Sequence, residues 1–346
     1  MQKKSFKSIV LAALALFCVT TLSAKEQFTK EIHKAWTPEQ VKELKINSKY
    51  GDISVHPMTG DSVIIDVVIT VEHSTQNKAD YLLDMIDVDF GASGGTVSAV
   101  TEFASKFKTR DSFSVDYFVY IPEDRALDFE LKYGAIRMND CTADSKFEVK
   151  YGKMYANNLT GQNTQLYLGY SRAEINETND VKADLKYSKV YIEKAGNIDV
   201  TSRYSVVSAD VALNFNADSR YDTFSFDELD GFKSTTKYTG ITIDKLNVHA
   251  SIENGYGQIT IKEVSPEFES IKINTQYGGV KMGMPADASY NLTVNTSYCS
   301  VKYPESNRLN KEKENTSMRL QGVIGDGTPT ATVNITSRYG NVNLIP

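Results

Sequence analysis

A tyrosine-centred phrase recurs along most of this chain, and its spacing restricts the possible fold more than any other feature. Near the N-terminus the phrase reads INSKYGDISVHP, and near the C-terminus it reads ITSRYGNVNLIP. It occurs twelve times, centred on Tyr50, Tyr133, Tyr151, Tyr170, Tyr187, Tyr204, Tyr221, Tyr238, Tyr256, Tyr277, Tyr298 and Tyr339. The step is 17 residues between Tyr187 and Tyr238, and 17 to 21 residues elsewhere in the central block. A short, nearly fixed period is typical of repeat architectures.

Each repeat has the hydrophobic pattern of two short strands joined by a corner. The residue four before the tyrosine is apolar in eleven of the twelve repeats, with Ser234 the exception, and the residues three and five after it are always apolar. Apolar residues two positions apart have the period of a half-buried strand. Across the tyrosine the distance to the next apolar residue is three, which changes the inward-facing parity and requires a corner in the chain. The residue after the tyrosine is Gly in six repeats, Ser in three, and Thr, Asp and Cys once each. We expect that residue to take the tight or positive-φ geometry of the corner.

This pattern predicts an all-β fold, a single-stranded β-solenoid (β-helix) of short 17–21-residue coils, with no helix inside the repeat. A 17-residue coil cannot enclose a core alone, so the coils must stack at the strand spacing of about 4.8 Å. The tyrosines should then form a ladder along one corner. We expect one domain over residues 25–346.

Two segments interrupt the repeat. Residues 61–124 contain longer strand patterns and one short amphipathic helix, expected over Ala79–Ile86, and should form a strand-rich cap. Residues 305–330 are charged and then glycine-rich, and should form a protruding loop or hairpin before the last coil. We expect the last coil to lie at the end of the stack, where Pro346 would blunt the exposed edge.

The first 24 residues have the pattern of a secretory signal peptide. A basic start is followed by an apolar run from Ile9 to Val19 and by the small pair Ser23–Ala24, which predicts cleavage before Lys25. Cys18 follows the bulky Phe17, which argues against lipid attachment. No other stretch approaches the roughly 20 apolar residues of a membrane span. We expect an exported protein of the periplasm or the cell surface that is not embedded in the membrane.

Charge and cysteine content narrow the possible partners. The formal net charge of −6 becomes −9 when the signal peptide, with its three lysines and no acidic residue, is removed. Such a chain is a poor partner for nucleic acid or anionic lipid surfaces. The two remaining cysteines, Cys141 and Cys299, belong to repeats nine coils apart. Nine steps span roughly 43 Å, so no intrachain disulfide is expected.

Three segments carry a resemblance to a known family. They read VKELKINSKYGDISVHP, VYIPEDRALDFELKYGAIRM and GDGTPTATVNITSRYGNVNL. The chain resembles the adhesin-like β-solenoids of exported proteins from Bacteroides-type bacteria, the DUF4097-like or head GIN domain-like proteins, over nearly all of its mature length. The resemblance implies a right-handed, single-stranded solenoid. It brings no catalytic residues.

One outward-facing row, directly before the tyrosines, is basic in eight of the twelve repeats. Four consecutive members are Lys186, Arg203, Arg220 and Lys237. Carboxylates two residues earlier, at Glu130, Glu148, Asp184 and Asp218, predict a surface ion ladder. The alternative is a stripe that binds an anionic glycan. The adjacent Tyr187, Tyr204, Tyr221 and Tyr238 should stack structurally, with a sugar-stacking platform as the alternative.

A second outward row lies six residues after each tyrosine. Asn139, Asn157 and Asn176 predict an amide ladder. The next members are all acidic: Glu193, Asp210, Asp227 and Asp244. Like charges one coil apart repel by about 1 kcal/mol even in water. Turn hydrogen bonds from the Asx side chains should relieve this repulsion, and a divalent cation is the weaker alternative.

No catalytic constellation is apparent in the sequence. The four histidines are scattered, HExxH is absent, and neither a nucleophile elbow nor a cofactor is expected. The leading hypothesis is a non-enzymatic binding or assembly scaffold at the cell envelope, whose partner is an envelope protein or a glycan. The second is a carbohydrate-binding module for anionic glycans. The third is a glycan-cleaving enzyme that uses the carboxylates of the Glu193–Asp244 row. Oligomeric state, ligand and biological process stay open.

Overall fold

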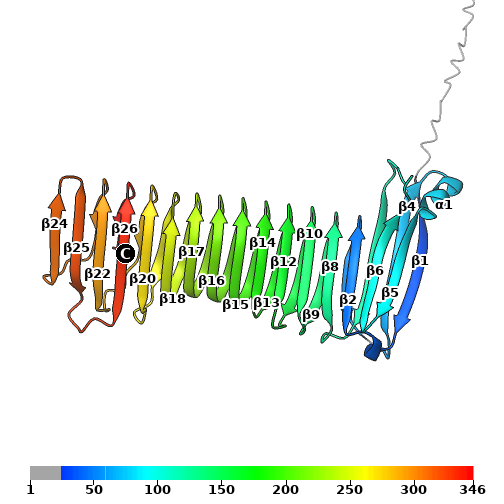
Figure 1. Ribbon diagram of the computed structural model, residues 1–346, viewed down its shortest axis with the longest axis horizontal. Coiled ribbons are helices and arrows are strands. Elements are labelled where there is room, and N and C mark those ends of the chain that lie inside the picture. The colour runs from blue at the N-terminus through cyan, green and yellow to red at the C-terminus, as the bar shows by residue number, and fades with distance from the viewer. Residues whose placement is uncertain (1–24, 59, 346) are drawn as a thin grey trace, which may run out of the picture.

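The chain forms a long stack of β-coils, closed at each end by antiparallel strands (Figure 1). The computed structural model describes residues 25–58 and 60–345, so the expected signal peptide and Pro346 lie outside the described residues. Within the described residues there are 27 strands, the α-helix α1 (Gln76–Leu83) and the short 3-10 turn η1 (Pro38–Gln40). The expected fold class, a β-solenoid with one short helix, is confirmed.

Every coil contributes to two parallel sheets that meet at the tyrosine corner. The pre-tyrosine face carries the strand segments that end just before the tyrosines. Its separate strands are β2 (Glu43–Lys49), β8 (Ala126–Lys132), β10 (Ser145–Lys150), β12 (Thr164–Gly169), β14 (Val181–Lys186), β20 (Ser270–Gln276), β22 (Tyr290–Ser297) and β26 (Ala331–Arg338). The post-tyrosine face carries β3 (Ile53–Pro57), β9 (Ala135–Cys141), β11 (Lys153–Leu159), β13 (Arg172–Thr178), β19 (Ile259–Val264), β21 (Val280–Met282), β23 (Val301–Lys302) and β27 (Val342–Asn343).

In the most regular coils one long strand runs over both faces. These strands are β15 (Lys189–Arg203), β16 (Val206–Arg220), β17 (Thr223–Lys237) and β18 (Gly240–Asn254). Each begins on the post-tyrosine face and ends on the pre-tyrosine face of the next repeat. Their pairing is parallel with equivalent residues aligned, as for Val190 with Val207 and Arg203 with Arg220. Side chains at one repeat position therefore lie above one another along the stack.

The core is the column of inward-facing side chains. The three inward positions expected from the sequence are buried, as shown by Phe147, Val190 and Ile192. Two further positions are also buried: the residue two before the tyrosine, such as Ser202, and the residue eight after it, such as Leu229. The second of these was missed because the alternation of buried and exposed residues breaks after the first four strand residues: Glu193 and Lys194 of β15 are both exposed, and Ala195 is the next buried residue.

The corner geometry corrects one expectation. The tyrosine itself has the left-handed backbone, with φ between 52° and 64° in eleven of the twelve repeats, and the small residue after it does not. Only the repeat of Tyr256 places the positive φ, 136°, on the following Gly257. The next residue is small because successive coils approach closely there: a Cβ on Gly134 would lie 1.7 Å from the carbonyl oxygen of Gly51.

Polar side chains fill the inside of the tyrosine corner. Asp222 is buried, and its carboxylate accepts hydrogen bonds from the Ser202 hydroxyl at 2.7 Å and from the Ser205 backbone N–H at 2.5 Å. Burial raises the pKa of Asp222 above its ordinary value, against the opposing effect of these hydrogen bonds. In the next coil Thr239 occupies the same position, and its hydroxyl lies 3.2 Å from that of Ser219.

The N-terminal cap lies beyond the first coil. Strand β2 is flanked by β6 (Thr96–Phe103) and β8, and β3 is flanked by β7 (Phe113–Ile121) and β9, so the first coil lies inside the stack. Antiparallel strands then extend both faces: β4 (Val63–His73) and β1 (Glu26–Trp36) beyond β7, and β5 (Ile86–Ser93) beyond β6. Helix α1 packs Ala79, Leu82 and Leu83 into this cap. It starts and ends three residues earlier than expected, because Ile86 belongs to β5.

The C-terminal end is closed in a similar manner, which contradicts the expected position of the last coil. Strand β26 lies between β20 and β22, and β27 lies between β21 and β23. Figure 1 accordingly shows the C-terminus within the stack. The outermost strands are β25 (Ser317–Ile324) and β24 (Leu309–Glu314), which extend the pre-tyrosine face as an antiparallel hairpin. These strands provide the closure that the last coil was expected to provide.

The outermost strand β24 carries charges on its core-facing side. Lys311 and Lys313 lie opposite Leu320 and Met318 of β25, and Leu320 is fully buried. Directly opposed residues of an antiparallel pair share one face of the sheet. The two lysines therefore point toward the side where a further coil would add its core.

Candidate functional site

The tyrosine rings form one continuous stack along the solenoid. Neighbouring ring centroids are 4.6 to 5.2 Å apart and the planes differ by 2° to 15°. The expectation of structural stacking is confirmed. Adjacent rings cover the ring faces inside the stack, so ring edges and hydroxyls remain exposed, with Tyr204 48% exposed. A sugar cannot lie flat on these inner rings.

The basic row runs beside the tyrosines on the pre-tyrosine face. Lys186, Arg203, Arg220 and Lys237 are exposed and aligned from coil to coil. The expected ion ladder forms in part: Lys132 lies 3.5 Å from Glu130, Lys150 lies 2.5 Å from Glu148, and Lys186 lies 3.9 Å from Asp184.

The expected pair of Asp218 with Arg220 does not form. Among the described residues, no carboxylate lies within 4.0 Å of the side-chain nitrogens of Arg203, Arg220 or Lys237. Within residues 25–58 and 60–345, three neighbouring cations of the row therefore lack an ion-pair partner.

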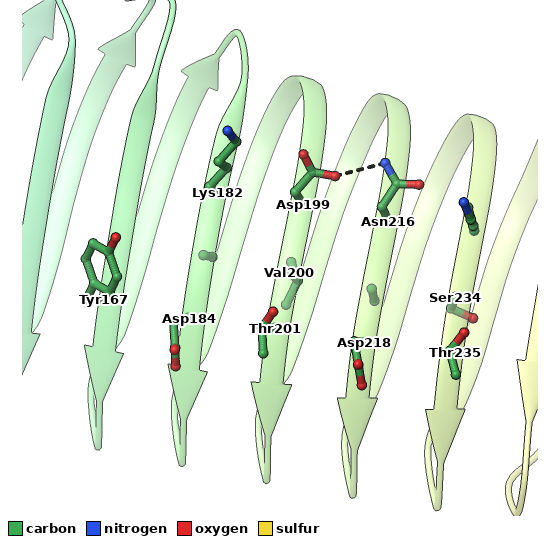
Figure 2. A pocket seen from close by; sticks show the side chains of 13 residues that line it. Tyr167, Lys182, Asp184, Asp199, Val200, Thr201, Asn216, Asp218, Ser234 and Thr235 are labelled. Atoms are coloured by element: carbon green, nitrogen blue, oxygen red, sulfur yellow. Dashed lines mark hydrogen bonds between the residues drawn. The ribbon is translucent and has the colours of Figure 1, made fainter.

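An open groove lies beside these cations, over β12, β14 and the pre-tyrosine parts of β15, β16 and β17 (Figure 2). Its volume is about 620 Å³. The outward side chains that line it are Tyr167, Lys182, Asp184, Asp199, Thr201, Asn216, Asp218, Lys233 and Thr235. Figure 2 shows them arranged on successive strands, with the amide of Asn216 donating to Asp199 at 2.9 Å.

Side-chain length explains why the face is hollow here. The middle of the groove carries short side chains, Asp199 and Thr201 on β15 and Asn216 and Asp218 on β16. Longer side chains stand at its two ends, Tyr167 at one and Lys233 at the other. This groove was not predicted from the sequence, although aligning the repeats at three and five residues before the tyrosine would have placed these short residues side by side.

In the N-terminal coils most charges of the same rows are paired, although Lys49 has no ion pair among the described residues. Lys45 and Lys146 lie 3.5 and 3.2 Å from Asp128, so that one carboxylate connects β2, β8 and β10. In the groove, by contrast, Lys182, Asp199, Asp218 and Lys233 have no ion-pair partner within 4.0 Å among the described residues. One sheet face thus contains a mostly neutralised segment followed by a segment with available charges.

The acidic row on the post-tyrosine face is relieved by neighbouring side chains. The hydroxyl of Tyr191 donates to Asp210 at 2.7 Å, and the Lys262 ammonium lies 2.7 Å from Asp244. The hydrogen bond to Asp210, followed by burial and the nearby carboxylates, raises the pKa of Tyr191 to about 12. These contacts involve neither of the two expected sources of relief, turn hydrogen bonds and a cation, and they leave Glu193 and Asp227 without an ion pair among residues 25–58 and 60–345.

The remaining candidates do not assemble into a second centre. Of the expected asparagine ladder one bond forms, from Asn176 to Asn157 at 3.3 Å. Cys141 is buried in β9, and Cys299 follows β22, both as free thiols. Within the described part of the chain, no three His, Cys, Asp or Glu side chains are arranged to hold a metal ion. No helix there is long and apolar enough to cross a membrane.

Comparison with known proteins agrees with the resemblance noted in the sequence. The family model described as "Toastrack DUF4097" matches residues 41–345. No curated protein matches the chain.

Several solved structures are similar at low identity. A "putative adhesin" from Bacteroides fragilis is 12% identical, with a TM-score of 0.33 and coverage of 91% of this chain and 97% of the other. A second, from Parabacteroides distasonis, is 8% identical, with a TM-score of 0.39 and coverage of 74% and 93%. A "putative lipid binding protein" from the same organism is 9% identical, with a TM-score of 0.27 and coverage of 91% and 97%.

Proposed function

This chain belongs to the Toastrack DUF4097 family, and we propose that it is a non-enzymatic, exported solenoid that binds an extended partner at the cell envelope. The observation that carries the proposal is the open groove over β12 to β17, with unpaired charges along a regular sheet. The N-terminal residues 1–24, with their signal-peptide pattern, support export.

The groove is suited to an elongated ligand because its outward-facing positions recur at the same register from coil to coil. Its side chains stand on aligned parallel strands, so their positions are fixed before a ligand arrives. Preorganised groups lose little conformational freedom on binding. A partner lying along the stack can contact equivalent positions on successive strands.

The groove chemistry favours binding over catalysis. Its carboxylates Asp184, Asp199 and Asp218 stand on an open sheet face, whereas acid catalysis by a carboxyl group needs a pKa raised by a buried or strongly coupled setting. Neither histidine nor cysteine lines the groove. The side chains present can donate and accept hydrogen bonds and can attract charge.

Co-sedimentation of the mature chain, residues 25–346, with bacterial envelope preparations tests this proposal. Thr201→Trp would fill the groove, and Thr242→Trp places the same change outward on the post-tyrosine face. We expect the wild type and Thr242→Trp to sediment with envelopes and Thr201→Trp to stay in solution. Equal sedimentation of both variants, or none of the wild type, contradicts the proposal.

The site of cleavage tests export separately. N-terminal sequencing of the chain purified from its own envelope should begin at Lys25. A chain that retains Met1 and stays with the cytosolic fraction would contradict export.

A further inference from the structure

We propose that the groove ligand is a linear acidic polysaccharide, lying along the stack with its anionic groups toward the basic row. This inference rests on the proposed function and adds the chemical class of the ligand. It is carried by the charge of the groove, by its hydrogen-bonding groups, and by the contrast with the N-terminal coils.

The groove and its rim form a cationic patch on an acidic protein. The six cations are Lys182, Lys186, Arg203, Arg220, Lys233 and Lys237. With the three carboxylates of the groove they give a formal charge of +3, on a mature chain of formal charge −9. Arg203, Arg220 and Lys237 stand one coil apart with no ion-pair partner among the described residues, and like charges in this arrangement repel one another. An anionic ligand would remove this repulsion and form charge-assisted hydrogen bonds.

The hydrogen-bonding groups of the groove fit hydroxyl groups. The carboxylates of Asp199 and Asp218 accept hydrogen bonds. The hydroxyls of Thr201 and Thr235 and the side-chain amide of Asn216 can both donate and accept them. The ring centroids of Tyr187 and Tyr204 are 4.9 Å apart, and so are those of Tyr204 and Tyr221, which gives the local distance between successive coils. A pyranose unit of an extended polysaccharide has a similar length, so successive sugars would meet successive coils.

Two other polyanions fit less well. Single-stranded nucleic acid binds by stacking its bases on aromatic faces, and the faces of the neighbouring tyrosines are covered by each other. An acidic polypeptide would place its carboxylates against the cations but has few hydroxyls for Asp199 and Asp218. The three groove carboxylates would repel a phosphate or carboxylate placed at the groove floor.

Binding of the mature chain to defined polymers tests the inference. The acidic glycan probes are hyaluronan, alginate, polygalacturonate and heparin, and the comparison probes are chitin oligosaccharides, poly-L-glutamate and single-stranded DNA. We expect at least one acidic glycan to bind more tightly than every comparison probe, with an affinity that falls as salt rises.

A matched pair of double variants assigns the binding to the unpaired cations. Arg203→Ala with Arg220→Ala removes cations that lack a partner, and Lys132→Ala with Lys150→Ala removes cations of the same row that are neutralised by Glu130 and Glu148. We expect the arginine variant to lose affinity about tenfold or more and to show a weaker salt dependence, and the lysine variant to lose less than about twofold.

The outcomes separate this inference from the proposed function. If no acidic glycan binds, or if both double variants weaken binding equally, the inference is wrong. If a neutral glycan, poly-L-glutamate or DNA binds more tightly and Thr201→Trp abolishes that binding, the groove function stands and the acidic polysaccharide is excluded. If envelopes still retain the wild type while every probe fails, only the ligand class is overturned.

Discussion

Because the repeat tyrosines have a left-handed backbone, replacing one of them by glycine should destabilise the fold less than replacing it by alanine. Tyr204 has φ 55° and its ring stacks on Tyr187 and Tyr221 at 4.9 Å on each side. A residue with a Cβ pays about 1–2 kcal/mol in the left-handed region, from which glycine is exempt. We therefore consider Tyr204→Ala, Tyr204→Gly and Tyr204→Phe.

The two stacking contacts of Tyr204 set the expected loss of stability in the truncated variants. An aromatic pair contributes about 0.5–1.5 kcal/mol beyond area burial, so losing two pairs costs about 1–3 kcal/mol in either truncation. Alanine keeps the left-handed strain, and glycine releases about 1–2 kcal/mol of it while adding about 0.5–1 kcal/mol of chain entropy. Tyr204→Gly should thus be more stable than Tyr204→Ala by up to about 1.5 kcal/mol. Tyr204→Phe keeps the stack and should lie within about 0.5 kcal/mol of wild type.

Urea unfolding followed by circular dichroism measures these differences. The comparison is valid where the denaturant slopes of the variants agree. As a control, the same pair of changes at Thr242, an outward strand position without positive φ, should show the usual order, with alanine above glycine. If Tyr204→Ala proves as stable as Tyr204→Gly or more so, the argument that stacking holds a strained corner fails.

Three further predictions concern the core, the corner and the end of the stack. Burial raises the pKa of Asp222 in the folded protein, so the free energy of unfolding should fall as the pH rises above 3.8, the ordinary pKa of an aspartate. Asp222→Asn should remove this loss of stability, and parallel curves of stability against pH for the two proteins would contradict the prediction. Gly134→Ala should lower the thermal midpoint by several degrees because its Cβ meets a backbone carbonyl at 1.7 Å, while Gly240→Ala, with nothing within 4 Å, should not; similar midpoints would refute the close approach. Replacing Lys311 and Lys313 by valine should produce oligomers in light scattering, because inward charges protect an edge; a monodisperse monomer would speak against that role.

The architecture was predictable because the repeat itself encodes it. Alternating apolar residues such as Val190 and Ile192 recur at fixed distances from a tyrosine, and both faces and the ladder follow from that regularity. The left-handed backbone of Tyr204 could not be read in the same way, since such geometry usually favours glycine and a glycine often stood next to the tyrosine.

The candidate site was only partly predictable. The row through Arg203 and Arg220 is visible as a column of cations once the repeats are aligned. Which cations are neutralised depends on side-chain conformation: Lys150 reaches Glu148, but Arg220 does not reach Asp218, although both pairs have the same spacing. The positions of the terminal coils depend on long-range pairing, which no local pattern specifies.

Enclosing the first and last coils within the stack changes how the solenoid would come apart. In a stack built in chain order, a terminal coil can unzip by breaking contact with a single neighbour. Here β26 must separate from both β20 and β22, and β2 from both β6 and β8. Amide exchange at Val333 and Ile335 should therefore be as slow as in the middle of the protein. Opening would begin at the outer hairpins, and these strands would protect the ends from unravelling.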